Sequence, residues 1–244
     1  TASGLGACAA TAGSDRGSAD EAGDRTLTVL AASSLTDPLT TLARAYEVDH
    51  PGVRVRLSLG SSTKLAQQVA QGAPADVVVL AGTAVLEQLP ESARDPSRRT
   101  VVARNVLEIA TPPDDPAGVS SLADLANPAA DVVLCVETAP CGSAADDVLE
   151  RAGVSANVVS REVDVRSTLA KIVLGEADAA IVYHSDVVTA GDRVRGVSIP
   201  ADANTTLDYP LVRLTDRADT TGFADLVASD AGRRALADAG FLTP

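Results

Sequence analysis

From residue 26 onward, hydrophobic and polar positions follow two alternating patterns along the chain. Short apolar runs, typical of strands, occupy 27–33, 53–60, 75–82, 99–112, 131–137, 157–163, 177–186, 195–200 and 207–215. Segments with apolar residues on one helical face lie at 35–52, 62–72, 83–90, 121–127, 141–153 and 164–176, with two further helices within 220–240. Repeated strand–helix units of this kind predict an α/β protein with mostly parallel sheets.

One pattern of elements occurs twice. In 61–82 a polar turn leads into a helix, a glycine and an Ala-Asp pair that opens a strand, and 164–186 repeats this order. One copy in each half of the chain predicts two similar lobes. Ligands of such folds bind at the carboxyl ends of strands, where helix N-termini gather.

The lobes can be assigned to parts of the chain. We assign 26–104 to the first lobe, with 208–244 returning to it, and 105–207 to the second lobe. The strands around 103–111 and 204–212 are then expected to cross between the lobes.

The first 25 residues differ from the rest. They are small, polar and rich in Gly, Ser and Asp, a composition that predicts a flexible tether. Within them, Leu5 to Cys8 read LGAC, which resembles the lipobox of bacterial lipoproteins, and a chance match is the alternative. We expect residues 1–7 to be the end of a signal peptide and Cys8 to be the lipidated residue.

Three cysteines are present, an odd number. With Cys8 lipidated, Cys135 and Cys141 remain on either side of a turn at 138–140. In an oxidising compartment they are expected to form a disulfide, whereas two buried free thiols are the default in the cytosol. Two cysteines without a neighbouring histidine make a poor zinc site.

Charge and motifs narrow the class of function. The formal charge is −13, so no basic face is expected for nucleic acid or an anionic membrane. The only histidines, His50 and His184, lie in no hydrolase-like context, and the nucleophile-elbow, phosphate-loop and dinucleotide-binding motifs are missing. We therefore do not expect an enzyme.

Two pairs of serines follow predicted strands. Ser33-Ser34 and Ser61-Ser62 each come just before a helix. A helix N-terminus offers unpaired N–H groups and a partial positive charge, and a serine hydroxyl adds another donor. One such serine is most simply a helix cap. Two pairs at successive turns of one lobe favour a site for a small anion.

The segment TVLAASSLTDPLTTLARAYEVDHPGVRVRLSLGSSTKLAQQVAQGAPADVVVLAG resembles the N-terminal half of the molybdate-binding proteins of bacterial ABC importers. ADAAIVYHSD, LDYPL and GRRALADAGF are similar to the rest of that family, so the resemblance covers about 27–244. It implies a two-lobed, type II periplasmic-binding-protein fold, each lobe a mixed, mostly parallel sheet flanked by helices. The implied ligand is a tetrahedral oxyanion, molybdate or tungstate, held in the cleft and delivered to a membrane permease.

The resemblance also implies the site residues. They are Ser34, Ser62 and Tyr183 through their hydroxyl groups, and Cys141 and Val165 through their backbone N–H groups. Molybdenum would be present only as the oxyanion, without direct protein ligands, and no cofactor is implied. Cys141 departs from the small alanine usual in the family, which would place a disulfide against the ligand.

We therefore expect a monomeric, extracytoplasmic binding protein, anchored to the outer face of the cell membrane by Cys8. One alternative is the same fold with sulfate or an organic anion as its ligand. Others are a two-lobed α/β enzyme and a lipoprotein adhesin without a ligand.

Overall fold

A computed structural model describes residues 25–244, so the tether, the lipobox and Cys8 lie outside the described residues. The strands run in the order β2-β1-β3-β9-β4-β7-β5-β6, and β8 pairs with β4. Their bounds are β1 (Arg25–Ala32), β2 (Val53–Gly60), β3 (Val77–Val79), β4 (Arg99–Thr111), β5 (Val132–Cys135), β6 (Val158–Glu162), β7 (Ala179–Tyr183), β8 (Arg195–Ser198) and β9 (Thr206–Arg213).

Within residues 25–244, seven α-helices connect and cover these strands. They are α1 (Thr36–Asp49), α2 (Ser62–Ala70), α3 (Pro140–Ala152), α4 (Val165–Val173), α5 (His184–Ala190), α6 (Ala218–Ala228) and α7 (Asp230–Asp238). Short 3-10 helices occur at η1 (Ser33–Leu35), η2 (Ala84–Gln88), η3 (Glu91–Ala93), η4 (Pro96–Arg98), η5 (Leu122–Ala126) and η6 (Gly191–Arg193). Within the described residues, no helix is both long enough and apolar enough to span a membrane.

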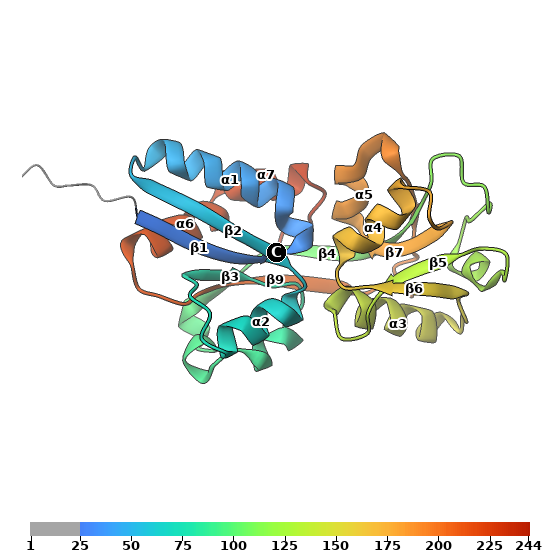
Figure 1. Cartoon of the computed structure of the whole chain (residues 1–244), viewed down its shortest axis with the longest axis horizontal. Helices are drawn as coiled ribbons and strands as arrows, with labels where there is room; N and C mark the ends of the chain where they lie inside the picture. Colours follow the sequence, from blue (N-terminus) through green and yellow to red (C-terminus); the bar gives the residue numbers. More distant parts are fainter. Residues whose placement is uncertain (1–24) are drawn as a thin grey trace, which may run out of the picture.

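Two lobes are visible, joined by β4 and β9 (Figure 1). In the first lobe β1 pairs in parallel with β2 and β3, and in the second lobe β5 pairs in parallel with β6 and β7. Residues 99–106 of β4 pair antiparallel with β9, and 107–110 pair antiparallel with β7. The strand β4 therefore passes from one lobe into the other. Among the described residues four strand pairs are parallel and four are antiparallel, because every pairing of β4 and β9 is antiparallel. The sheet is therefore mixed, as the family resemblance implies, but not mostly parallel.

Helices cover both faces of each lobe (Figure 1). In the first lobe, α1, α6 and α7 lie on one face and α2 on the other; in the second, α4 and α5 lie opposite α3. The Tyr46 ring of α1 meets Phe223 of α6 edge-on, with centroids 5.5 Å apart, and its hydroxyl donates to the Asp219 carbonyl at 3.1 Å. The last helices therefore pack against α1 of the first lobe.

The prediction of one strand over 177–186 is wrong at its end. The strand β7 stops at Tyr183 and α5 begins at His184, because the Asp186 carboxylate accepts the Tyr183 N–H at 3.2 Å and caps the new helix. Val187 and Val188 are β-branched and favour a strand, so the sequence pattern does not predict this helix.

Two other predicted helices, at 83–90 and 121–127, take the 3-10 form as η2 and η5. Each holds only five residues. A segment of this length makes too few i→i+4 hydrogen bonds to stabilise an α-helix.

Candidate functional site

The structure brings the five predicted site residues together around one small cavity between the lobes. Ser34 and Ser62 come from the first lobe, and Cys141, Val165 and Tyr183 from the second. All five are at most 4% exposed. The other lining residues are Ala32, Ser33, Gly60, Ser61, Ala81, Ala139, Pro140 and Asp164.

Four α-helices of the described chain begin at this cavity. Their N-cap residues all line it: Ser61 for α2, Ala139 for α3, Asp164 for α4 and Tyr183 for α5. The first N–H groups of a helix have no acceptor within the helix, so each start contributes donors and a partial positive charge. None of the described lining residues is Lys or Arg. Backbone dipoles at the helix starts are therefore the source of positive charge that this lining offers to a small anion.

The Ser62 hydroxyl is oriented by a backbone contact. Its oxygen accepts the N–H of Ala81 at 2.8 Å, and the side chain is buried at the start of α2. This bond occupies a lone pair and leaves the hydroxyl hydrogen free. Ser62 can therefore donate to a group in the cavity.

The Tyr183 hydroxyl lacks a partner. Its oxygen is fully buried and makes no hydrogen bond to any described residue. An unpaired buried hydroxyl costs about 1–3 kcal/mol, so its presence at the cavity indicates a partner that the protein itself does not supply. Burial raises the pKa of Tyr183 well above its usual value of 10, which keeps the hydroxyl a neutral donor.

The Ser34 hydroxyl has a partner that the sequence analysis missed. Its oxygen lies 3.0 Å from the hydroxyl oxygen of Tyr209, and both side chains are buried. Tyr209 belongs to β9 and does not line the cavity. It lies in the LDYPL segment, which carried the family resemblance without pointing to any single residue.

Asp164 also lines the cavity and was not predicted. Its carboxylate accepts the Ser167 N–H at 3.0 Å and caps α4. An aspartate directly before the first residue of a helical pattern is a recognisable cap signal, so this residue could have been found.

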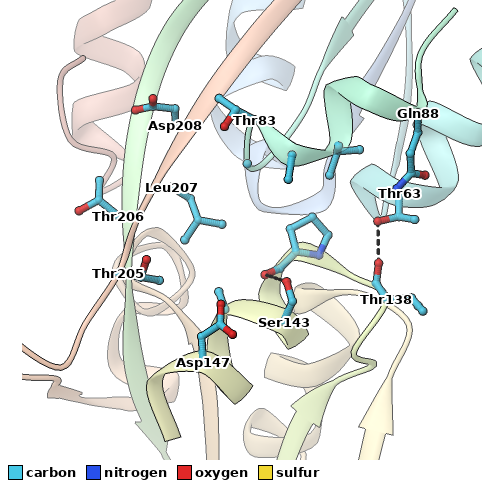
Figure 2. Close-up of a pocket in the computed structure, with 15 residues that line it drawn as sticks. Thr63, Thr83, Gln88, Thr138, Ser143, Asp147, Thr205, Thr206, Leu207 and Asp208 are labelled. Carbon is cyan, nitrogen blue, oxygen red and sulfur yellow. Dashed lines mark hydrogen bonds between the residues drawn. The ribbon is translucent and has the colours of Figure 1, made fainter. Parts of the chain in front are cut away.

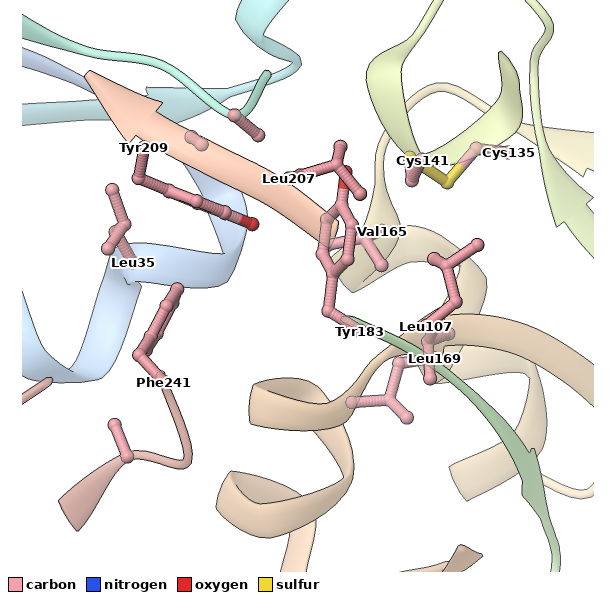
Figure 3. Packing of buried hydrophobic residues seen from close by; sticks show 14 of the residues in the cluster. Leu35, Leu107, Cys135, Cys141, Val165, Leu169, Tyr183, Leu207, Tyr209 and Phe241 are labelled. Atoms are coloured by element: carbon pink, nitrogen blue, oxygen red, sulfur yellow. A yellow bond between two sulfur atoms is a disulfide. The ribbon is translucent and has the colours of Figure 1, made fainter. Parts of the chain in front are cut away.

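The two remaining cysteines form a disulfide. Cys135 at the end of β5 and Cys141 in the first turn of α3 are bonded, with Cα atoms 5.8 Å apart, and Figure 3 shows the bridge close to Val165 and Tyr183. The next residue must be glycine, because a Cβ at Gly142 would lie 2.0 Å from the Val136 carbonyl oxygen. The disulfide and this close approach both fix the N-terminus of α3 against the cavity.

Contacts between the lobes close the cleft around the cavity. Arg166 of α4 pairs with the Asp37 carboxylate of α1 and lies 3.4 Å from the Ser33 carbonyl oxygen. Thr63 of α2 donates to the Thr138 carbonyl at 2.7 Å. Both contacts join a first-lobe residue to a second-lobe residue, so both must break when the lobes separate.

The closed cavity measures ≈ 10 Å³, which is room for about one water molecule. A tetrahedral oxyanion needs more space than this. The lobes must therefore move apart for such a ligand to enter.

A larger cavity of ≈ 380 Å³ lies beside it in the cleft (Figure 2). It is lined by Thr63, Thr138, the first residues of β9 and two carboxylates, Asp147 and Asp208. Carboxylates repel a dianion. The smaller cavity is lined by one carboxylate, that of Asp164, which already accepts the Ser167 N–H, and by the N-termini of helices, so it is the candidate anion site.

A family model described as bacterial extracellular solute-binding protein matches residues 27–242. The chain belongs to this family. Among relatives in the solute-binding family, the molybdate-binding protein ModA of Mycobacterium tuberculosis is 33% identical over 244 residues, covering 99% of this chain and 94% of the relative. The ModA protein of Haemophilus influenzae is 32% identical, covering 88% and 89%.

A solved structure shows the fold of the family. The periplasmic molybdate-binding protein of Azotobacter vinelandii superposes with a TM-score of 0.75 at 20% identity, covering 89% of this chain and 99% of that one. The resemblance to molybdate-binding proteins, read first from the sequence, is therefore confirmed, as is the two-lobed α/β fold.

Proposed function

We propose that this solute-binding protein captures molybdate in the small cavity between its lobes. The observation that carries the proposal is the Tyr183 hydroxyl, a fully buried donor without a partner among the described residues, facing a cavity built at helix N-termini. Ser34, Ser62 and the backbone N–H groups of Cys141 and Val165 supply the other donors. The names of the two ModA relatives support the same ligand.

The chemistry of the cavity favours a dianion that carries no proton. Phosphate near neutral pH keeps a proton and needs an acceptor, so it should bind poorly. Sulfate has no proton but is smaller than molybdate, so lobes that close to the dimensions of molybdate would leave their donors too far from the sulfate oxygens. Tungstate has the charge and shape of molybdate and should bind as well.

The proposed role is delivery of the oxyanion to the permease of an ABC importer outside the cytoplasm. The protein would act as a monomer without catalytic activity or cofactor, held at the outer face of the membrane by lipidated Cys8. Phase partitioning tests the anchor: the native protein should enter detergent, and Cys8→Ser should release it. A soluble native protein that retains residues 1–7 would contradict the anchor.

Isothermal titration and thermal melting with molybdate, tungstate, sulfate and phosphate test the ligand. Molybdate and tungstate should each raise the melting temperature, because a ligand that binds only the folded state stabilises it. Sulfate and phosphate should have little effect. Equal shifts from sulfate and molybdate would refute the specificity, and a protein that binds none of the four anions would refute the proposed function.

A further inference from the structure

Tyr209 is a buried hydroxyl residue next to the candidate site that the proposed ligand contacts do not include. It is fully buried on β9, one of the two strands that cross between the lobes. Its ring meets Phe241 edge-on at 5.2 Å and Tyr183 edge-on at 6.1 Å. In Figure 3 the Tyr209 side chain extends toward Tyr183, and its hydroxyl oxygen is at the end that points to Tyr183.

The contact between Tyr209 and Ser34 has two possible directions. The two hydroxyl oxygens are 3.0 Å apart, and either can donate. An anion such as molybdate accepts hydrogen bonds and donates none. If Ser34 gives its only hydrogen to the anion, it has none for Tyr209, so Tyr209 must be the donor to Ser34.

The surroundings of Tyr209 allow it to act as this donor. Burial raises the pKa of Tyr209, so its hydroxyl keeps its proton throughout the neutral range. Its ring is fixed by packing on Phe241 and Tyr183, so the hydroxyl oxygen is held in place and only its hydrogen turns.

We propose that Tyr209 is a positioning residue of the anion site, whose O–H donates to Ser34 and so directs the Ser34 hydrogen at the bound oxyanion. The inference rests on the proposed function, because it needs an anion as the acceptor. It assigns a role to the crossing strand β9, which lies outside the cavity lining but orients a donor inside it.

A double-mutant cycle with molybdate tests this role. Tyr209→Phe keeps the packed ring and removes only the hydroxyl, and it should weaken molybdate binding about three- to ten-fold. Ser34→Ala should weaken binding more. Because Tyr209 acts through Ser34, the double variant should bind molybdate as Ser34→Ala does, without a further loss.

Tyr46→Phe is the matched control. Tyr46 is also a buried tyrosine of the first lobe, and its hydroxyl donates to the Asp219 carbonyl at 3.1 Å, away from the cavity. Its loss should lower the melting temperature about as much as Tyr209→Phe does in the absence of anion. It should leave molybdate affinity unchanged.

The possible outcomes separate the two proposals. Unchanged affinity in Tyr209→Phe overturns the positioning role, and so does a double variant in which the two losses simply add. A wild-type protein that binds no oxyanion overturns the proposed function and the positioning role together.

Discussion

At the residue scale, what matters is where each hydroxyl hydrogen can go. Ser62 already accepts from Ala81, and Tyr183 has no partner among the described residues, so each can give its hydrogen to a ligand. Ser33 differs in its role although it lines the same cavity. Its carbonyl oxygen receives bonds from the Thr36 hydroxyl at 2.6 Å and from Arg166 at 3.4 Å, and neither bond needs the Ser33 side chain.

The first prediction follows from this difference. Ser34→Ala, Ser62→Ala and Tyr183→Phe should each weaken molybdate binding by about 1.5–3 kcal/mol, or roughly 10- to 150-fold. Ser33→Ala should weaken it far less. Isothermal titration measures the molybdate affinity of all four variants. If Ser33→Ala lost as much affinity as the other three, the assignment of Ser34 and not Ser33 as the donor would be contradicted.

A second prediction concerns Asp186. Asp186 is fully buried, and this burial is the main reason why its pKa is raised to about 7. The charge of Arg166 acts to lower the pKa, and the charges of Asp164 and Asp37 act to raise it. In the unfolded chain an aspartate has a pKa of about 3.9. Between pH about 4 and about 7 the folded protein therefore holds a proton that the unfolded chain has lost. The contribution of Asp186 to stability is full below about pH 4 and falls as the pH rises to about 7.

Asp186→Asn keeps an acceptor for the Tyr183 N–H but does not titrate. Its melting temperature relative to wild type should therefore rise between about pH 5 and about pH 7.5. Asp230→Asn is the control, because the ion pair with Arg233 lowers the pKa of Asp230 and moves its titration below this range. A pH-independent difference for Asp186→Asn would contradict the prediction.

A site residue could be predicted from the sequence where it lies in a segment that resembles the molybdate-binding family. The segments AASSL, GSSTKLA, APCG, VDVRSTLA and IVYHSD pointed to the five cavity residues that the structure brings together. Tyr209 and Arg166 were missed because each acts through a partner far away in the chain. Asp186 was missed because the pattern placed it at the end of a strand and not in the first turn of α5. Tyr209 meets Ser34 across 175 positions, and no local pattern encodes such a contact.

At the element scale, the site is an arrangement of helix starts. Strand ends and helix N-termini were predictable from the alternating patterns, and they place α2, α3 and α4 at the cavity. The start of α5 was not predictable, since its cap is a carboxylate three residues inside the helix and its valines resemble a strand.

The third prediction tests a backbone donor. Val165 is the first residue of α4, where proline is tolerated, so Val165→Pro should remove one N–H without breaking the helix. We expect weaker molybdate binding, by roughly 10-fold or more, at nearly unchanged melting temperature without anion. Val165→Ala is the control, because it keeps the N–H, and it should bind molybdate nearly as wild type does.

The fourth prediction concerns the disulfide. Replacing Cys135 and Cys141 by serine should lower stability by about 2 kcal/mol and also weaken molybdate binding, because the start of α3 is then less fixed. Melting and titration of the double variant measure both effects. Thiol titration of the denatured, unreduced wild type should count neither sulfur as free, and two free thiols would refute the bond in the native protein.

At the scale of the whole molecule, the proposed function requires the lobes to open and close. The internal repetition in the sequence predicted two lobes, but it could not show what holds them together. The structure shows Arg166 in contact with Asp37 and Ser33 of the other lobe, and 3.8 Å from the buried Asp186 carboxylate of its own lobe.

The fifth prediction follows from the ion pair between lobes. Asp37→Lys replaces attraction to Arg166 by repulsion and should speed molybdate dissociation about two- to five-fold, with a smaller effect at high salt. Asp146→Lys is the matched control, because Asp146 pairs with Arg161 at 2.7 Å inside the second lobe. Stopped-flow dissociation compares the two, and equal rates in both variants would exclude a contribution of the ion pair to closure.

The strand β4 determines how that motion takes place. Its pairing changes from β9 to β7 between Val106 and Leu107, and the Asn204 side chain binds both the N–H and the carbonyl of Leu107, at 3.1 and 2.8 Å. The point at which β4 passes between the lobes is therefore itself hydrogen-bonded. Rotation about such a point is confined to few dihedral angles, so the lobes return to the same register at each closure and the donors of the cavity reassemble in the same geometry.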